Sequence, residues 1–176
     1  PGREILVALA DAYGSYTYHD KNDGVSSSGG RILAQTLDEA TYFMDMAWAY
    51  DLLSTSTGWQ GDEKERVEND LLRAAVHTIQ RYDAGISNWQ SWHNGAIAAV
   101  GFVLEDPTLI QAAIQGGSGF LFQMAEGTGV DGFWHEGSWS YHYYALDPLM
   151  LTAEAGQRAG LPLWEEEVLG DMFTLI

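Results

Sequence analysis

Two segments of the chain combine aromatic, histidine, carboxamide and carboxyl side chains at a density that neither a surface loop nor a core needs. The first reads Asn-Trp-Gln-Ser-Trp-His-Asn-Gly over residues 88–95. The second reads Asp-Gly-Phe-Trp-His-Glu-Gly-Ser-Trp-Ser-Tyr-His-Tyr-Tyr over residues 131–144. Aromatic rings stack on other flat surfaces, whereas histidine, tyrosine and carboxyl groups transfer protons. Together the two segments predict a cleft that stacks rings and moves protons.

The first segment places three polar side chains, Asn88, His93 and Asn94, in the first turns of an otherwise apolar helix. Ser87 and Gln90 have the spacing of a capping box, which predicts that the helix begins here. The amide groups and the positive end of the dipole at a helix start attract carboxylates. An asparagine amide beside an imidazole could therefore bind and neutralise a substrate carboxylate. The alternative is structural, with Asn88 as a cap and the other two bonded to neighbouring backbone.

The second segment is expected to begin a helix with Ser138 as its cap. This places Tyr141 in the first turn, where a phenol can project into a cleft, and sets a proton donor beside a base, His142. Glu136 could orient a histidine or cap the helix. Core packing is the competing explanation for the surrounding aromatic residues, namely Trp134, Trp139, Tyr143 and Tyr144.

Composition and charge exclude several classes of function. The 176 residues are 46% hydrophobic, which suffices for one domain with a real core. With 25 acidic and 8 basic residues the net charge is −17, which disfavours nucleic acids and anionic membrane surfaces as partners. There is no cysteine to form a disulfide or to act as a nucleophile. No apolar run approaches the ~18 residues of a membrane span.

The sequence carries no cofactor signature. The candidate ligands His93, His135, His142 and Glu136 do not match a zinc-binding spacing. A phosphate loop, a dinucleotide fingerprint and a Gly-x-Ser-x-Gly elbow are all missing from the sequence. We therefore expect neither a metal nor an organic cofactor.

The hydrophobic periodicity is helical almost throughout, and no segment alternates as a strand does. A polar-striped helix, residues 62–81, lies between two that are apolar on most sides, residues 36–53 and 88–104. Thr36-Leu-Asp-Glu39 reads as a capping box, whereas residues 21–30 (KNDGVSSSGG) read as a flexible loop. The short connections predict an all-α fold: an (α/α) toroid, or incomplete barrel of helical hairpins, in two concentric layers. Loops at one end of such a toroid would line the cleft.

We expect residues 1–176 to form a single helical domain that is part of a longer toroid. The chain begins at Pro1 rather than at methionine, and it ends on the apolar run of residues 171–176. Both features are typical of a piece of a longer protein.

The two motifs resemble the heparinase II/III and alginate lyase superfamily of polysaccharide lyases. In that group an (α/α) toroid carries an Asn-Trp-x-x-x-(His/Cys)-Asn-Gly-like segment and, later, Asp-Gly-x-x-x-Glu-Gly-x-x-x-Tyr. Residues 88–95 and 131–141 match these patterns, and residues 47–53 (Ala-Trp-Ala-Tyr-Asp-Leu-Leu) resemble the family's upstream helix. The resemblance covers about residues 31–164.

This resemblance implies β-elimination on uronate-containing glycans, either alginate or a glycosaminoglycan-like polymer. It implies that Asn94 and His93 neutralise the substrate carboxylate or abstract a proton, and that Tyr141 is the proton donor. It also implies a substrate-binding set made of Asn88, Trp89, Trp92, Trp139, Glu136 and His142, in which the tryptophans, with Trp134, stack on sugar faces.

The resemblance further implies an acidic polysaccharide as partner, no nucleic acid or membrane, and a secreted or periplasmic location. It implies a C-terminal β-sandwich beyond this chain that adds catalytic and positively charged groups. Few basic residues lie where a polyuronate cleft could use them: Lys21, Arg31, Arg81 and Arg158. Two alternatives stay open. One is a glycoside hydrolase on a helical toroid, with Asp131 and Glu136 as its carboxylates; the other is a non-catalytic, glycan-binding helical module.

Overall fold

The computed structural model describes residues 1–175, and these residues are built from helices. In chain order the elements are α1 (Gly2–Tyr13), α2 (Thr36–Ser54), α3 (Glu63–Arg66), the π-helical η1 (Val67–Arg73), α4 (Ala74–Ile79), α5 (Asn88–Val103), α6 (Pro107–Gln115), α7 (Phe120–Glu126), α8 (Trp139–Arg158), the 3₁₀-helical η2 (Leu163–Glu165) and α9 (Glu167–Thr174). Extended backbone in these residues pairs only at two isolated bridges, His19 with Gly30 and Thr128 with Trp134. The predicted all-α fold is confirmed. Ile176, the last residue of the apolar run, lies outside the described residues.

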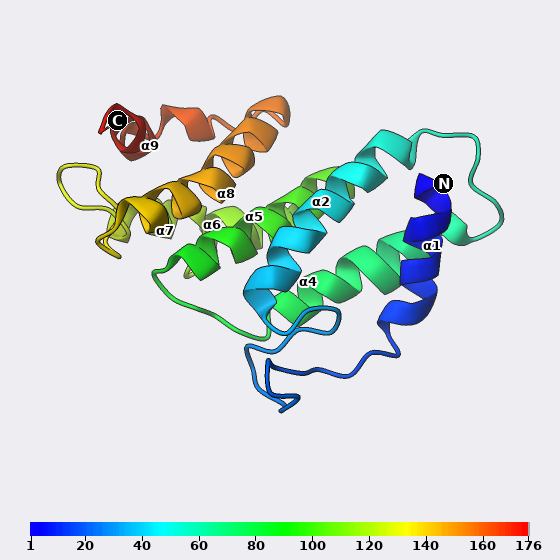
Figure 1. Ribbon diagram of the computed structural model, residues 1–176. Helices are drawn as coiled ribbons and strands as arrows, with labels where there is room; N and C mark the ends of the chain where they lie inside the picture. The colour runs from blue at the N-terminus through cyan, green and yellow to red at the C-terminus, as the bar shows by residue number, and fades with distance from the viewer. Residues whose placement is uncertain (176) are drawn as a thin grey trace.

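Three long helices, α2, α5 and α8, run side by side in the same direction, so that their first residues lie at one end of the molecule (Figure 1). Helix α5 is the middle one and contacts both α2 and α8. Helices α4 and η1 pack beside α2, α6 packs on α5, and η2 and α9 pack on α8. This alternation of inner and outer helices is the toroid-like arrangement that the sequence predicts.

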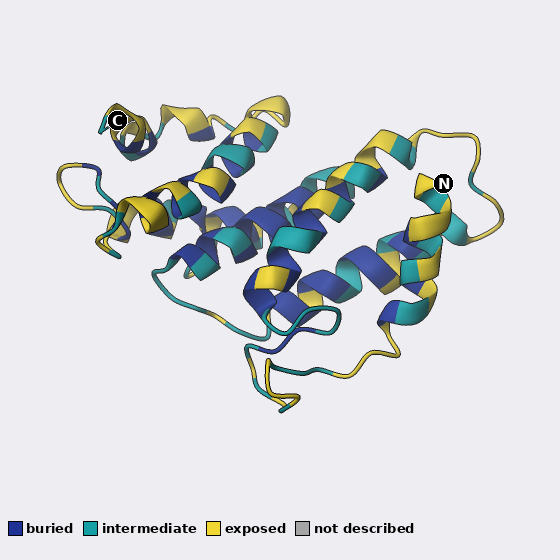
Figure 2. Cartoon of the chain, in the orientation of Figure 1, coloured by how far each residue is buried: buried dark blue, intermediate teal, exposed yellow. Residues whose placement is uncertain are grey.

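Helix α5 is the buried centre of the arrangement, and it appears almost entirely dark blue in Figure 2. Two glycines let its neighbours approach closely. A Cβ at Gly95 would lie 2.4 Å from the Cε atom of Met44 in α2 and 3.1 Å from the Cβ atom of Pro148 in α8. A Cβ at Gly101 would lie 3.0 Å from the backbone nitrogen of Ile110 in α6. The position of α5 therefore depends on small residues where three helices meet it.

Helix α2 is less buried than its sequence predicts. Trp48 is 42% exposed and Leu52 is 83% exposed, although the helix is apolar nearly all round. These residues, with Phe102 and Val103 of α5 and Leu151 of α8, line an apolar groove of about 540 Å³ where the inner helices end. An inner helix that is apolar on most sides is expected to be buried on every side. This expectation is wrong for this part of α2, because none of residues 1–175 covers it.

The helix starts confirm some of the expected caps. Ser87 accepts a hydrogen bond from the Gln90 backbone N–H at 3.2 Å, and Ser138 does the same for the Tyr141 N–H at 3.1 Å. Asp106 caps α6, with Pro107 as its first residue. These interactions join residues two or three positions apart, which explains why the local sequence was enough to predict them.

The capping box expected at α2 is wrong. Gln35, not a side-chain cap, precedes the helix, and the hydroxyl of Thr36 has no hydrogen-bond partner among the described residues. The buried Glu39 carboxylate instead accepts backbone N–H groups of residues 31–33, and the hydroxyl of Tyr13 donates to it at 2.7 Å. The chain before α2 folds back over the helix start, so its amide groups reach the carboxylate. This holds residues 31–33, which directly follow the segment predicted to be flexible, against α2.

Candidate active site

Glu136 joins the two sequence motifs. One oxygen of its carboxylate accepts the backbone N–H of Asn88 at 2.8 Å, and the side-chain amide of Asn88 donates to the same carboxylate at 2.8 Å. The indole N–H of Trp134 donates to it at 2.6 Å. A carboxylate at the start of α5 is also favoured by the positive end of the helix dipole. These hydrogen bonds fix the loop before α8 to the first residue of α5. The spacing of residues within each motif did not predict this contact between the motifs.

Tyr141 lies in the first turn of α8, as predicted. Its backbone N–H is bonded to the Ser138 cap, and its side chain is 49% exposed. No hydrogen bond within residues 1–175 involves its phenol oxygen. Trp139 and Tyr143 are exposed on the same helix, and their rings lie 6.1 Å apart. Tyr141, two residues from each, projects from a different side of the helix. The start of α8 therefore presents an exposed phenol on one side and open aromatic faces on another.

His142, the residue after Tyr141, points into the protein instead. It is fully buried, and its ring lies parallel to that of Phe133 at a centroid distance of 5.2 Å. Its Nδ1 accepts the backbone N–H of Trp134 at 3.2 Å, so Nε2 carries the proton and donates to the carbonyl of Met172 at 3.0 Å. Both ring nitrogens thus hold the turn and α9 in place. This placement does not support the predicted contact of His142 with substrate.

His93 is buried at the start of α5, with 1% of its surface exposed. Its ring packs edge-on against Tyr82 at 6.4 Å, and neither ring nitrogen has a partner with hydrogen-bond geometry among the described residues. Burial lowers the pKa of His93 to about 4, and the charge of Asp83 and the nearby backbone of Tyr82 and Thr36 oppose this shift only in part. The imidazole is therefore neutral at pH 7. It can donate one hydrogen bond and accept another, but it carries no positive charge.

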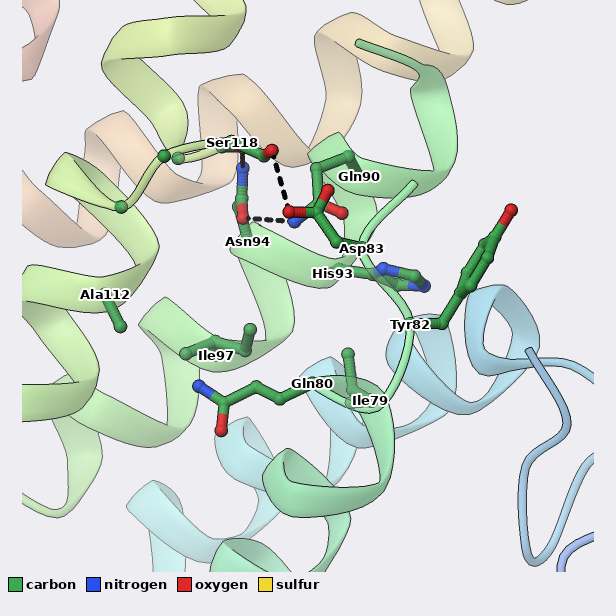
Figure 3. A pocket seen from close by; sticks show the side chains of 13 residues that line it. Ile79, Gln80, Tyr82, Asp83, Gln90, His93, Asn94, Ile97, Ala112 and Ser118 are labelled. Carbon is green, nitrogen blue, oxygen red and sulfur yellow. Dashed lines mark hydrogen bonds between the residues drawn. The ribbon is translucent and has the colours of Figure 1, made fainter. Parts of the chain in front are cut away.

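Asn94 is also buried, and both ends of its amide are occupied. Its oxygen accepts the side-chain amide of Gln90 at 2.9 Å, and its nitrogen donates to the carbonyl of Ser118 at 2.8 Å. Asn94 and His93 line one pocket of about 150 Å³. In Figure 3 the Asn94 side chain points to Ser118, while the His93 ring lies beside Tyr82. The carboxylate of Asp83 closes one side of this pocket by accepting the Ser118 hydroxyl at 2.9 Å.

The structure therefore brings the predicted residues together in two groups. His93 and Asn94 share the pocket between α4, α5 and the 116–119 turn. Asn88 and Glu136 meet where α5 begins, in the loop that leads into α8 and its first-turn residue Tyr141. Tyr141 is not among the residues that line the pocket. Of the polar residues at the start of α5, Asn88 is the one bonded to the motif that contains Tyr141. The catalytic and binding roles assigned to these residues stay predictions.

The tryptophans of the two motifs differ in what they offer a ligand. Trp134 is fully buried, so the core-packing explanation holds for it. Trp89 is half-buried against Tyr82 at 6.1 Å, and Trp92 is half-buried against Tyr144 at 5.2 Å. Trp139 is the widely exposed member of the set, so its ring face is the one most open to a ligand.

Tyr82 and Asp83 were missed by sequence reasoning. They follow α4 and reach His93 and the pocket from outside both motifs. The only available signal was their position just before the helix start at Ser87. No three His, Asp or Glu side chains of the described residues are grouped closely enough to hold a metal ion. No helix among these residues has the length and apolar character needed to cross a membrane.

The parallel inner helices are backed by outer ones, and this arrangement defines an (α/α)-toroid domain. The candidate active site lies at the end where the inner helices begin, because the exposed phenol and the exposed aromatic rings are there. The sequence model of the alginate lyase family matches residues 8–173. The chain belongs to this family.

Two curated relatives agree with this assignment. An alginate lyase of Stenotrophomonas maltophilia (strain K279a) is 26% identical over 165 residues, which is 89% of this chain and 21% of that protein. An exo-oligoalginate lyase of Saccharophagus degradans (strain 2-40) is 26% identical over 163 residues, which is 87% of this chain and 21% of that protein. The chain spans about a fifth of the length of these relatives.

Proposed function

We propose that the protein to which this chain belongs is a polysaccharide lyase that cleaves alginate-type polyuronates by β-elimination. Membership of the alginate lyase family supports the class of reaction, and the names of the two relatives support the substrate. The structural observation that carries the proposal is the exposed, unbonded phenol of Tyr141. It lies one turn into α8, on the helix whose preceding loop is fixed to Asn88.

In this reaction a base removes the proton at C5 of the uronate, and the C4–O bond breaks as a C4–C5 double bond forms. Tyr141 donates its proton to the departing glycosidic oxygen. The C5 proton becomes acidic enough only when the adjacent carboxylate is neutralised, because the negative charge otherwise opposes the carbanion-like transition state. Hydrogen-bond donors or cations must therefore contact that carboxylate.

The start of α5 is the proposed place for this contact. Asn88 is bonded through Glu136 to the motif that contains Tyr141, so its amide positions the site. His93 and Asn94 line the neighbouring pocket, and they are the groups proposed to meet the carboxylate. Since His93 is neutral and the Asn94 amide is occupied, neither supplies charge. The hydrolase alternative is weaker, because the hydrogen bonds that Glu136 accepts from Asn88 and Trp134 favour its ionised form and so oppose a role as general acid.

The proposal is tested with the full-length protein and alginate, by following the ultraviolet absorbance of the new conjugated double bond. We expect Tyr141→Phe to lower the rate by about 10²- to 10⁴-fold, the usual contribution of a general acid. Thermal stability should not change, because the hydroxyl is solvent-exposed and unbonded. Tyr143→Phe is the matched control, since Tyr143 is 44% exposed on the same helix and should keep wild-type activity.

Two results would overturn the proposal. The first is a wild-type protein that produces no such absorbance with alginate or with a panel of other uronate polymers. The second is a Tyr141→Phe variant that is as active as Tyr143→Phe. Release of reducing ends without the double bond would favour the hydrolase.

A further inference from the structure

Among residues 1–175, two arginines have no carboxylate partner, although acidic residues outnumber basic ones 25 to 8 in the sequence. The salt bridges within residues 1–175 involve Arg3, Lys64, Arg66, Arg73 and Arg158. None involves Arg31 or Arg81, and both of these are partly buried. An arginine in such an acidic protein usually finds a carboxylate, so two neighbouring exceptions call for an explanation.

Tyr18 brings the two guanidinium groups together. The Cζ atom of Arg81 lies 3.5 Å from the centroid of the Tyr18 ring, and that of Arg31 lies 4.4 Å from it. Arg31 also donates to the Tyr18 hydroxyl at 3.3 Å. Stacking of this kind stabilises a cation without neutralising it. We call Tyr18, Arg31 and Arg81 the arginine–tyrosine cluster.

The cluster is held in a fixed position by the loop before α2. Arg31 donates to the carbonyls of Gly14 at 3.0 Å and Tyr16 at 2.7 Å, and its own backbone N–H is held by Glu39. Arg81 makes only two longer contacts, at 3.4 Å each, with carbonyls of the same loop. Arg31 is therefore largely engaged with the backbone, whereas Arg81 keeps most of its donor capacity for another partner.

The cluster lies beside the candidate active site. Arg81 is followed directly by Tyr82, whose ring contacts Trp89 and His93 in the first turns of α5. The loop is tied to the start of α2 by the Thr36 N–H, which donates to the carbonyl of Ser28 at 2.8 Å. The positive charge is thus located at the end of the toroid where the inner helices begin.

We propose that Arg81, supported by Arg31, binds a carboxylate of the polyuronate chain, and that Tyr18 is the residue that positions both guanidinium groups. The planar guanidinium of arginine matches a carboxylate with two parallel hydrogen bonds. Prior ordering by Tyr18 lowers the entropy lost when the ligand binds. The inference rests on the proposed function, and it identifies a cationic group within this chain that an acidic polymer can meet.

The test uses the full-length protein and compares Arg81→Gln with Arg158→Gln. Arg158 is one of the basic residues that the sequence predicts near the cleft, but the structure places it at the last residue of α8, at the end away from Tyr141. It is the matched control, because its side chain is 78% exposed and pairs with Glu154. We expect Arg81→Gln to raise KM for alginate oligomers about 10- to 100-fold, the usual effect of losing a hydrogen bond to a charged group, with kcat nearly unchanged. Arg158→Gln should change neither. The KM of the wild type should rise with ionic strength more steeply than that of Arg81→Gln.

A binding measurement separates this inference from the proposed function. Calorimetric titration of oligouronates into the Tyr141→Phe variant measures affinity without turnover. Adding Arg81→Gln should weaken binding of the acidic oligomer by the same 10- to 100-fold and leave binding of its methyl-esterified form unchanged. This result would support the carboxylate site even if the wild type cleaved no uronate polymer.

A purely structural role for the cluster predicts the opposite pattern. In that case Arg81→Gln would lower the melting temperature while KM and affinity stayed at wild-type values, and the inference would be wrong. If Arg81→Gln fails to fold, Arg81→Lys keeps the charge and loses the planar pair of donors, and it should show a smaller rise in KM. Unchanged KM and affinity in a folded Arg81→Lys variant would likewise overturn the inference.

Discussion

The starts of α5 and α8 contain the same residue types but use them in opposite ways. At the start of α5, the side chains of Asn88, His93 and Asn94 are buried, and the two asparagine amides are bonded inside the protein. At the start of α8, Trp139 and Tyr141 are about half exposed. The difference indicates that the first region builds the site and the second region presents groups to the ligand. Substitutions in the first region should therefore cost stability, whereas in the second region they should change turnover with little loss of stability.

The largest stability effect that we expect in this comparison belongs to His93. Its pKa is about 4 in the folded protein, below the ordinary histidine value of about 6.5, so the unfolded chain binds a proton first as the pH falls. The neutral ring therefore contributes stability that is fully present above pH 6.5 and is lost toward pH 4. The loss is about 3 kcal/mol of unfolding free energy between pH 7 and pH 4.

Denaturant unfolding at a series of pH values measures this effect. His93→Leu, which cannot titrate, should lose about 3 kcal/mol less than the wild type over the same range. The variant also serves as its own control for the many carboxyl groups, since they titrate in both proteins. Parallel pH profiles for the two proteins would contradict the burial of a neutral His93.

A smaller effect is expected where the two regions meet, at Glu136. Glu136→Ala leaves the backbone and amide N–H groups of Asn88 and the indole N–H of Trp134 without an acceptor. We expect a loss of about 2 kcal/mol in unfolding free energy, because partly buried donors lose their partner. Activity should fall further than this loss explains, since the Tyr141 loop is no longer fixed to α5.

Glu136→Gln distinguishes the geometry of this interaction from its charge. Glutamine keeps one acceptor oxygen and the shape of the side chain, so it should retain part of both stability and activity. Thermal unfolding and initial lyase rates on the full-length protein provide the two readouts. An alanine variant as stable and as active as the wild type would show that the two helix starts are positioned independently.

The sequence predicted the features that depend on near neighbours. The all-helical pattern, the caps at Ser87 and Ser138, and the exposed position of Tyr141 follow from residues within one or two turns. Helical periodicity and capping are local properties, and a single sequence is sufficient to recognise them.

The errors and omissions involve residues that are far apart in the chain. Tyr13 donates to Glu39 from 26 residues away, and Glu136 bonds Asn88 from 48 residues away. The pairing of Tyr18 with Arg81 also joins distant segments. Hydrogen-bonding capacity alone does not identify which partner the fold brings near, so the sequence named several of these residues without their contacts.

The smallest expected effect compares the two serine caps, which have nearly identical geometry. Ser87 and Ser138 each accept a backbone N–H three residues on, at 3.2 and 3.1 Å. Replacing either with alanine should lower the unfolding free energy by about 1 kcal/mol, the usual cost of losing a cap. The activities should differ, because the N–H that Ser138 holds belongs to Tyr141 and the N–H that Ser87 holds belongs to Gln90.

Ser138→Ala should therefore lower kcat several-fold at a temperature where the protein stays folded, whereas Ser87→Ala should leave kcat near the wild-type value. Equal stability losses make the pair a matched test, because any general loosening of a helix start would affect both variants alike. If the two variants lost activity equally, the start of α8 would have no closer connection to turnover than the start of α5. The division of the two regions into one that builds the site and one that presents the phenol would then be wrong.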